Sequence, residues 1–142
     1  MFTVTESVTI DRPVDEVFAF FTEGRARWDE SVISEELTSP PPVGVGSTLH
    51  TRMRAVGREF AFDWRVTDYE PGSRMAVTST SGIMPTSSEL VFADANGATL
   101  VTVRIEAEPT GMMRLAQGMI AGEVRSTLET SLSKAKRILE QG

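Results

Sequence analysis

Hydrophobic residues recur at helical spacing over the last third of the chain, from Met112 to Leu139. On a projection of about 100° per residue they gather within about 80° of one line. This face contains Met113, Gln117, Ile120, Val124, Leu128, Leu132, Ala135, Ile138 and Leu139. The pattern predicts one amphipathic helix about 42 Å long, which needs a broad apolar partner and crosses a small domain.

A two-residue alternation predicts a strand at the other end of the chain, from Phe2 to Ile10. Pro13 then suits the first turn of a short helix, because its missing N–H is not needed there. A second short helix is expected from Arg25 to Asp29, and an edge strand from Val32 to Thr38. A connector rich in proline and glycine follows, over residues 39–46.

Apolar and polar residues alternate in successive short runs between Ser47 and Pro109. Turn residues separate the runs, and Asn96 with Gly97 gives the strongest hairpin signal. Each run therefore has one apolar and one polar face, which is typical of an antiparallel sheet exposed on one side. Layer packing then predicts an α+β fold within one domain, residues 1–142. In it a curved antiparallel sheet of six or seven strands wraps around the long C-terminal helix.

Composition narrows the classes of partner. The net charge of −6 and a pI of about 4.8 disfavour nucleic acid and anionic membrane surfaces. The chain has no cysteine and one histidine, so we expect no metal site and no cofactor. No apolar run reaches membrane-spanning length and the first residues lack a signal-peptide pattern, which makes the cytoplasm the expected location.

Several segments resemble a known family in the expected order. These are residues 10–18 (IDRPVDEVF), Trp28, residues 43–47 (VGVGS), residues 66–72 (VTDYEPG) and residues 96–99 (NGAT). The chain resembles the START-like, Bet v 1-like (SRPBCC) superfamily, and within it the polyketide cyclase/dehydrase and lipid-transport group. The resemblance implies a helix-grip fold and a cavity between the sheet and the C-terminal helix that takes a hydrophobic small molecule.

The alternation supplies candidate lining residues for that cavity. Inward-facing apolar positions alternate with a few polar groups that could orient a ligand. The candidates are Thr51, Met53, Phe60, Phe62, Trp64, Met75, Ser79, Ser88, Leu90, Phe92, Met113, Gln117, Ile120 and Val124. The alternative is that these side chains fill one another's space as an ordinary core.

Acid–base catalysis would require a titratable group inside the cavity. The alternation places His50 on the outer, polar face of the sheet. Glu6 is the carboxylate whose phase points inward, and a pairing with a nearby arginine is the simpler role for it. The sequence therefore assigns no catalytic residue.

Three functions stay open at this point. The first is a binding protein that holds a lipid-like or polyketide-like molecule, and it is our preferred interpretation. The second is a cyclase or dehydratase that acts in the same cavity, which a perturbed titratable group inside would favour. The third is a protein-interaction module of the chaperone-activator kind, which a filled core and an exposed apolar patch would favour.

A second apolar stripe occurs at the start of the long helix. Met112, Leu115 and Met119 follow helical spacing on the side away from the main stripe. We expect this stripe to be covered. The candidates are a gate made of residues 39–45 with residues 83–85, or the same stripe of a second copy in a homodimer.

Overall fold

The computed structural model describes residues 1–55 and 57–141. The chain begins with β1 (Phe2–Ile10), α1 (Val14–Thr22), the 3₁₀ turn η1 (Arg25–Arg27) and β2 (Val32–Leu37). Five further strands follow: β3 (Thr48–Ala55), β4 (Arg58–Glu70), β5 (Arg74–Ser81), β6 (Thr86–Ala95) and β7 (Ala98–Ala107). The chain ends with the 3₁₀ helix η2 (Gly111–Ala116) and α2 (Gln117–Gln141).

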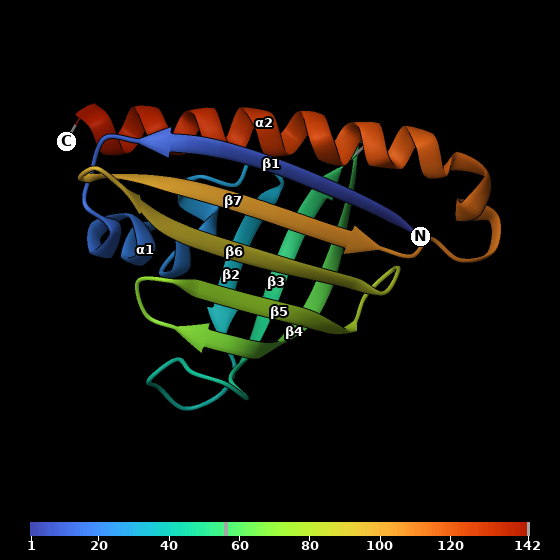
Figure 1. Ribbon diagram of the computed structural model, residues 1–142. Helices are drawn as coiled ribbons and strands as arrows, with labels where there is room; N and C mark the ends of the chain where they lie inside the picture. Colours follow the sequence, from blue (N-terminus) through green and yellow to red (C-terminus); the bar gives the residue numbers. More distant parts are fainter. Residues whose placement is uncertain (56, 142) are drawn as a thin grey trace.

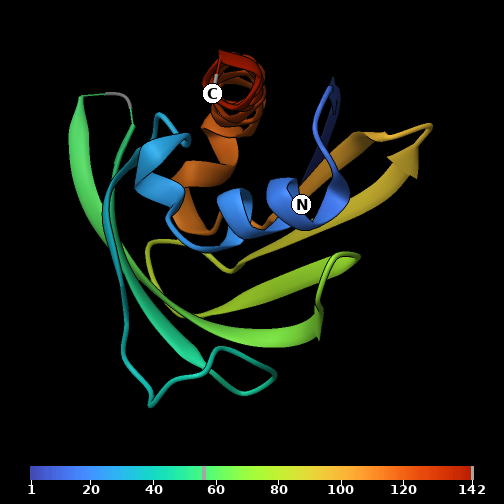
Figure 2. The same ribbon diagram turned by 90° about the vertical axis from the view of Figure 1, so that its left-hand side faces the viewer.

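The strands form one antiparallel sheet of seven, in the order β1-β7-β6-β5-β4-β3-β2. The sheet curls into a half-barrel, and α2 lies across its open side next to β1 (Figure 1). Figure 2 views α2 nearly end-on and shows the sheet bending around it from β1 to β2. The predicted α+β helix-grip architecture is confirmed.

The register of β3 and β4 decides which side chains face α2. Phe60 pairs with Met53 and Trp64 pairs with Leu49, so these side chains share one face of the sheet. His50 pairs with Asp63 one residue out of phase and therefore shares the opposite face. The apolar alternation thus directs the aromatic residues of β4 to the concave side.

The C-terminal helix departs from the prediction at its start. We expected one helix from Met112 onward, but residues 111–116 are 3₁₀ and the α-helix begins at Gln117. Thr110 makes no side-chain capping bond, and Gly118 with Gly122 lowers the helix propensity of the first turns. The rest of α2 buries Leu128 and its neighbours at helical spacing, as predicted.

The second short helix is also smaller than predicted. η1 is a single 3₁₀ turn, in which the carbonyl of Arg25 accepts hydrogen bonds from the N–H groups of Trp28 and Asp29. The turn ends because the chain must turn at once into β2, whose Val32 N–H bonds to the carbonyl of Asp29. This tight geometry directs Arg25 and Asp29 toward the inside of the half-barrel.

Aromatic side chains close one end of the half-barrel. The ring of Phe21 lies 4.6 Å from Trp28 and 5.8 Å from Phe92, centroid to centroid. Phe18 adds an edge contact to Phe92 at 5.1 Å. Such edge and tilted pairs contribute stability beyond their buried area, so this aromatic cluster stabilises one end of the fold.

Glu6 has the structural role that the sequence favoured. Its carboxylate lies 2.7 Å from Nη1 of Arg125, and this ion pair joins β1 to α2.

Within the described residues, no helix is both long and apolar enough to span a membrane.

Candidate ligand-binding cavity

A cavity of about 480 Å³ lies between β3, β4 and the first half of α2. That volume falls in the range of small-molecule sites in proteins. Most of the residues that the sequence predicted for the cavity line it. They are Met53, Phe60, Phe62, Trp64, Ser88, Met113, Ile120 and Val124.

One wall of the cavity is an aromatic stack on β4. Phe62 and Trp64 are nearly parallel, with ring centroids 5.0 Å apart, and Phe60 meets Phe62 edge-on. Opposite them, Ile120 and Val124 of α2 are partly buried, and they line the cavity as well as packing against the core. The two walls therefore offer an apolar ligand contact on both sides.

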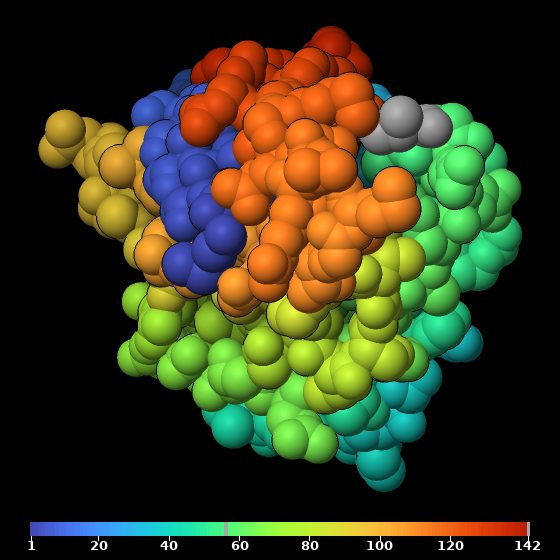
Figure 3. All heavy atoms as spheres, turned by 90° about the vertical axis from the view of Figure 1, so that its right-hand side faces the viewer, coloured from blue at the N-terminus to red at the C-terminus, as the bar shows by residue number. Residues whose placement is uncertain are grey.

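A loop and a 3₁₀ helix contribute to the lining of the cavity. Ile83 and Met84, between β5 and β6, line it together with Met113 of η2. Figure 3 shows the start of the C-terminal helix (orange) directly above this loop (yellow-green) on one end of the molecule. Both segments lie outside the strands of the sheet.

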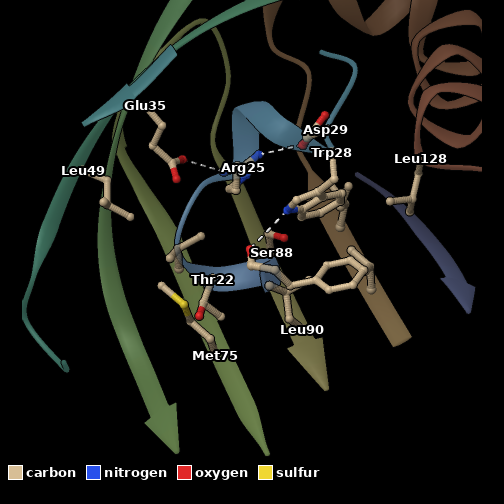
Figure 4. A pocket seen from close by; sticks show the side chains of 14 residues that line it. Thr22, Arg25, Trp28, Asp29, Glu35, Leu49, Met75, Ser88, Leu90 and Leu128 are labelled. Carbon is tan, nitrogen blue, oxygen red and sulfur yellow. Dashed lines mark hydrogen bonds and ion pairs between the residues drawn. The ribbon is translucent and has the colours of Figure 1, made fainter. Parts of the chain in front are cut away.

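A smaller void of about 50 Å³ lies deeper in the half-barrel. Met75 and Leu90, two further predicted residues, line this void and not the larger one. Ser88, Arg25 and Asp29 line both, so they form the partition between the two spaces. Figure 4 shows the side chains around the smaller void.

A charged cluster includes two of these residues, Arg25 and Asp29, together with Glu35, which lines only the smaller void. Arg25 Nη1 lies 3.3 Å from Glu35 Oε2, and Arg25 Nη2 lies 3.1 Å from Asp29 Oδ2 (Figure 4). The side chains of Arg25, Asp29 and Glu35 are only 18, 15 and 10 % exposed. Thr51 donates its hydroxyl hydrogen to Glu35 Oε2 at 3.0 Å, and Ser31 donates to Asp29 Oδ1. We call Arg25, Asp29 and Glu35 the inner cluster.

The inner cluster keeps its arginine charged. Burial alone would lower the pKa of Arg25, but the charges of Glu35 and Asp29 outweigh it, so that the pKa lies above its ordinary value. The guanidinium carbon also lies 5.8 Å from the Trp64 ring centroid, within reach of a cation–π contact. A buried charge of this kind persists only with such partners.

Trp64 carries a polar atom without a partner. Its indole Nε1 is buried and makes no hydrogen bond to any described residue. A buried donor left unpaired costs roughly 1–3 kcal/mol, and such groups are rare in native proteins. Trp64 lines the larger cavity with its ring, while this nitrogen has no accessible surface.

Two polar candidates have other partners. Thr51 is fully buried and lies behind the inner cluster, where its hydroxyl group is used by Glu35. Ser79 Oγ accepts a hydrogen bond from the backbone N–H of Thr86 at 2.9 Å. Both side chains thus satisfy polar groups of the sheet and line neither void.

Two further candidates also lie outside both voids. Phe92 packs on Phe18 and Phe21 in the aromatic cluster at one end of the fold. Gln117 is the first residue of α2, and its side chain bonds to the amino group and carbonyl of Met1. The helical projection placed Gln117 inward, but its side chain is held by Met1 and lies outside the cavity.

His50 lies on the convex face, as the alternation predicted. Its Nδ1 lies 2.8 Å from Asp63 Oδ1, and Ser81 donates to the other oxygen at 2.6 Å. The hydrogen bonds from Ser81 and then His50 hold the pKa of Asp63 below its ordinary value. Across the described residues, no group of three or more His, Asp or Glu side chains is arranged to hold a metal ion.

The charged lining was absent from the sequence prediction. Arg25 and Asp29 were expected on a short helix, without a role, and Glu35 on an edge strand. One signal was present, since Arg25 and Asp29 are four residues apart, a spacing that pairs side chains on a helical turn. Glu35 pairs with Thr51 across β2 and β3, a register that the sequence alone did not define.

Comparison with known proteins agrees with this architecture. Residues 1–140 match the family described as polyketide cyclase/dehydrase and lipid transport, and the chain belongs to this family. The family resemblance seen in the sequence is therefore confirmed. The chain matches no curated protein sequence at significant similarity.

Solved structures show the same fold at low sequence identity. A protein of Thermus thermophilus superposes with a TM-score of 0.83 at 17% identity, covering 99% of this chain and 98% of that one. The Zhui aromatase/cyclase of a Streptomyces species gives 0.79 at 16% identity, covering 99% and 94%. A START superfamily protein of Mycobacterium smegmatis gives 0.79 at 15% identity, covering 98% and 97%. These matches establish a START-like fold.

Proposed function

We propose that this chain is a single START-like domain that binds a hydrophobic small molecule in the cavity between the sheet and α2. The observation that carries the proposal is the 480 Å³ cavity, whose lining is mainly aromatic and aliphatic. A filled core would have buried Ile120, Val124 and Met53 completely, and they are only partly buried. Family membership supports the same conclusion.

Binding of the neutral dye N-phenyl-1-naphthylamine tests this function. The dye should become fluorescent with the native protein, and the emission of Trp64 should change because its ring lines the cavity. Val124→Phe should weaken binding by filling the space between the walls. Ile138→Phe adds an aromatic ring at a partly exposed position of α2 outside the cavity and should leave binding unchanged. Dye binding that is equal in both variants would contradict the proposal.

A second candidate is a cyclase or dehydratase that uses the same cavity. The observation in its favour is that Asp29 places a carboxylate at the boundary of the cavity, where acid–base chemistry requires a titratable group. A carboxylate could remove the proton between two carbonyl groups of a poly-β-ketone chain, so that the resulting carbon attacks a third carbonyl. Incubation with a poly-β-ketone thioester, followed by mass spectrometry, should show loss of water in the wild type and not in Asp29→Asn. An unchanged thioester with both proteins would contradict the enzymatic function and leave binding as the remaining one.

The proposal also includes a homodimer. Met112, Leu115 and Met119 are 86, 88 and 65 % exposed, and Met1 beside them is exposed as well. The expected gate does not cover these side chains, because residues 39–45 lie at the far side of the sheet and the β5–β6 loop lines the cavity instead (Figure 1). We call these four residues the methionine patch. A second copy is the occupant we propose, since a two-fold axis matches the patch with itself.

One observation favours a protein-interaction function, and it is the same exposed methionine patch. An open apolar cavity is not needed for that role, whereas ligand binding requires it. We therefore retain ligand binding as the main proposal.

A further inference from the structure

The larger cavity is elongated along α2. Its lining on this helix runs from Ile120 to Leu128, which corresponds to about 12 Å along the helix axis. Leu128 also lines the smaller void, whereas Ile120 does not. The end of the cavity near Leu128 is therefore the one that adjoins the smaller void.

The two ends of the cavity differ in polarity. The residues shared with the smaller void include the charged Arg25 and Asp29 and the hydroxyl-bearing Ser88. The opposite end lies near the start of the C-terminal helix, where the lining is apolar (Figure 3). It includes Ile83, Met84 and Met113. A ligand with one polar end would thus place that end next to the smaller void.

The charged groups at the polar end already bind one another. Asp29 Oδ2 accepts a hydrogen bond from Arg25, and its Oδ1 accepts from both the backbone N–H and the hydroxyl group of Ser31. The other terminal nitrogen of Arg25 binds Glu35. These side chains are therefore held in place and satisfied without a ligand.

The hydroxyl group of Ser88 has no such partner. Ser88 lies on β6 in phase with the buried Leu90 and Phe92, so its side chain is on the concave face of the sheet. Its Oγ makes no hydrogen bond to a described residue. It is also not a buried atom, since within the described chain the buried side-chain polar atom that lacks a partner is Trp64 Nε1. Ser88 Oγ is therefore accessible from the two spaces that Ser88 lines.

Two other hydroxyl groups of the lining are less suited to a ligand. Thr86, two residues before Ser88 on the same strand, donates its hydroxyl hydrogen to the carbonyl of Met84 at 3.0 Å. Thr127 lies one helical turn after the exposed Glu123 on the same face of α2, where water competes for its hydroxyl group. Ser88 is thus the hydroxyl group that the fold presents at the inner, polar end.

We propose that Ser88 determines ligand specificity by donating its hydroxyl hydrogen to a carbonyl or hydroxyl oxygen at one end of an otherwise apolar ligand. A serine hydroxyl supplies one donor and can accept as well, so it suits an uncharged oxygen. The apolar remainder of the ligand then extends toward Met84 and Met113, where it meets only apolar side chains. This inference rests on the proposed binding function and adds the class of ligand and its orientation.

A pair of isosteric ligands tests this role. The ketone 4-phenylbutan-2-one and the hydrocarbon isopentylbenzene have the same shape, because a CH–CH₃ group replaces C=O. Both are titrated as competitors of N-phenyl-1-naphthylamine, and the ratio of their affinities is measured. Ser88→Ala should reduce the preference for the ketone by roughly threefold to tenfold, since one hydrogen bond is lost. The difference in hydration between the two ligands is the same for every variant, so it does not affect the comparison.

Two variants serve as controls for the position of the hydrogen bond. Thr86→Val also removes a lining hydroxyl group from β6, but one that is already used by Met84. Its affinity ratio should stay within about twofold of wild type. Thr127→Val removes the hydroxyl group on α2, and the ratio should again stay within about twofold.

The outcomes separate the role of Ser88 from the binding function. If Ser88→Ala binds the dye with the wild-type ratio, or if Thr127→Val alone lowers the ratio, the role of Ser88 is overturned and the binding function stands. A folded wild type that does not bind the dye would overturn the binding function itself. Should Ser88→Ala fail to fold, Ser88→Cys keeps a side chain of similar size with a weak donor and must lower the ratio in the same direction.

Discussion

The ring of Phe62 occupies the space in which a Cβ atom on Gly82 would lie. Gly82 follows β5 with φ of +151°, a conformation that other residues rarely adopt, and Phe62 belongs to the aromatic wall of the cavity. The β5–β6 loop and the cavity wall are thus in direct contact. A side chain at Gly82 must displace the Phe62 ring, which lines the cavity.

Gly82→Ala should therefore weaken dye binding and destabilise the protein. Backbone strain of about 1–2 kcal/mol adds to an overpacking cost of about 1–3 kcal/mol. Gly97→Ala is the control, since Gly97 also has positive φ but open space around it. Gly97→Ala should lower the free energy of unfolding by the backbone strain alone and leave dye binding unchanged. Urea denaturation with a parallel dye titration measures both effects, and equal losses in the two variants would contradict the contact.

Leu128→Ala should enlarge the cavity. Leu128 is buried in α2 and lines both voids, so truncation of its side chain adds volume to voids that already exist. We expect a loss of about 2–5 kcal/mol in the free energy of unfolding, together with binding of bulkier ligands. Leu132→Ala removes the same groups from a buried position that lines neither void, and should destabilise without changing ligand size preference. Identical ligand preferences in both variants would argue against Leu128 as part of the wall.

The fold was predictable because its signals are periodic. Alternation in β4 placed Phe60, Phe62 and Trp64 on one face, and the long helix placed Val124 and Leu128 opposite them. A sheet that bends around a helix then follows from burying both apolar faces.

The polar part of the site was not predictable for the opposite reason. Arg25 and Asp29 belong to a short turn without periodicity, and Glu35 to an edge strand whose register contains a bulge. These three residues come together only when the chain has folded.

The start of the long helix was not predictable either. α2 begins at Gln117 because of local helix propensity, which a helical projection does not take into account.

Arg25→Met should destabilise the protein by about 3–5 kcal/mol, because it leaves two buried carboxylates without their cation. Adding Glu35→Gln to Arg25→Met should restore part of the loss, since one of the stranded charges is removed. Urea denaturation of the single and double variants measures both. A loss below about 1 kcal/mol in Arg25→Met would show that water reaches the inner cluster freely.

The end of α2 should make stability depend on acid pH. Lys136 and the backbone N–H of Asp11 bind the Glu140 carboxylate and hold its pKa below the ordinary value of 4.5. Its contribution is therefore present above pH 4.5 and is lost as the pH falls through the lower folded-state value. Glu140→Gln should lower Tm at neutral pH, and its Tm should approach that of the wild type in strong acid. Glu129→Gln, an exposed change on the same helix, should track the wild type throughout. A Tm difference that is constant with pH would contradict this linkage.

Met119→Glu tests the homodimer through the methionine patch. Three largely exposed apolar side chains on η2 and the first turn of α2, with Met1 beside them, form a surface that water solvates poorly. A glutamate at its centre would bring two like charges together across a two-fold axis, so the dimer should dissociate. Sedimentation velocity should show wild-type dimer and mutant monomer at the same concentration, with dye binding retained because Met119 does not line the cavity. Ser126→Glu puts the same charge on an exposed position of α2 outside the patch and should remain dimeric. A wild type that sediments as a monomer at every concentration would remove the second copy as the occupant of this patch.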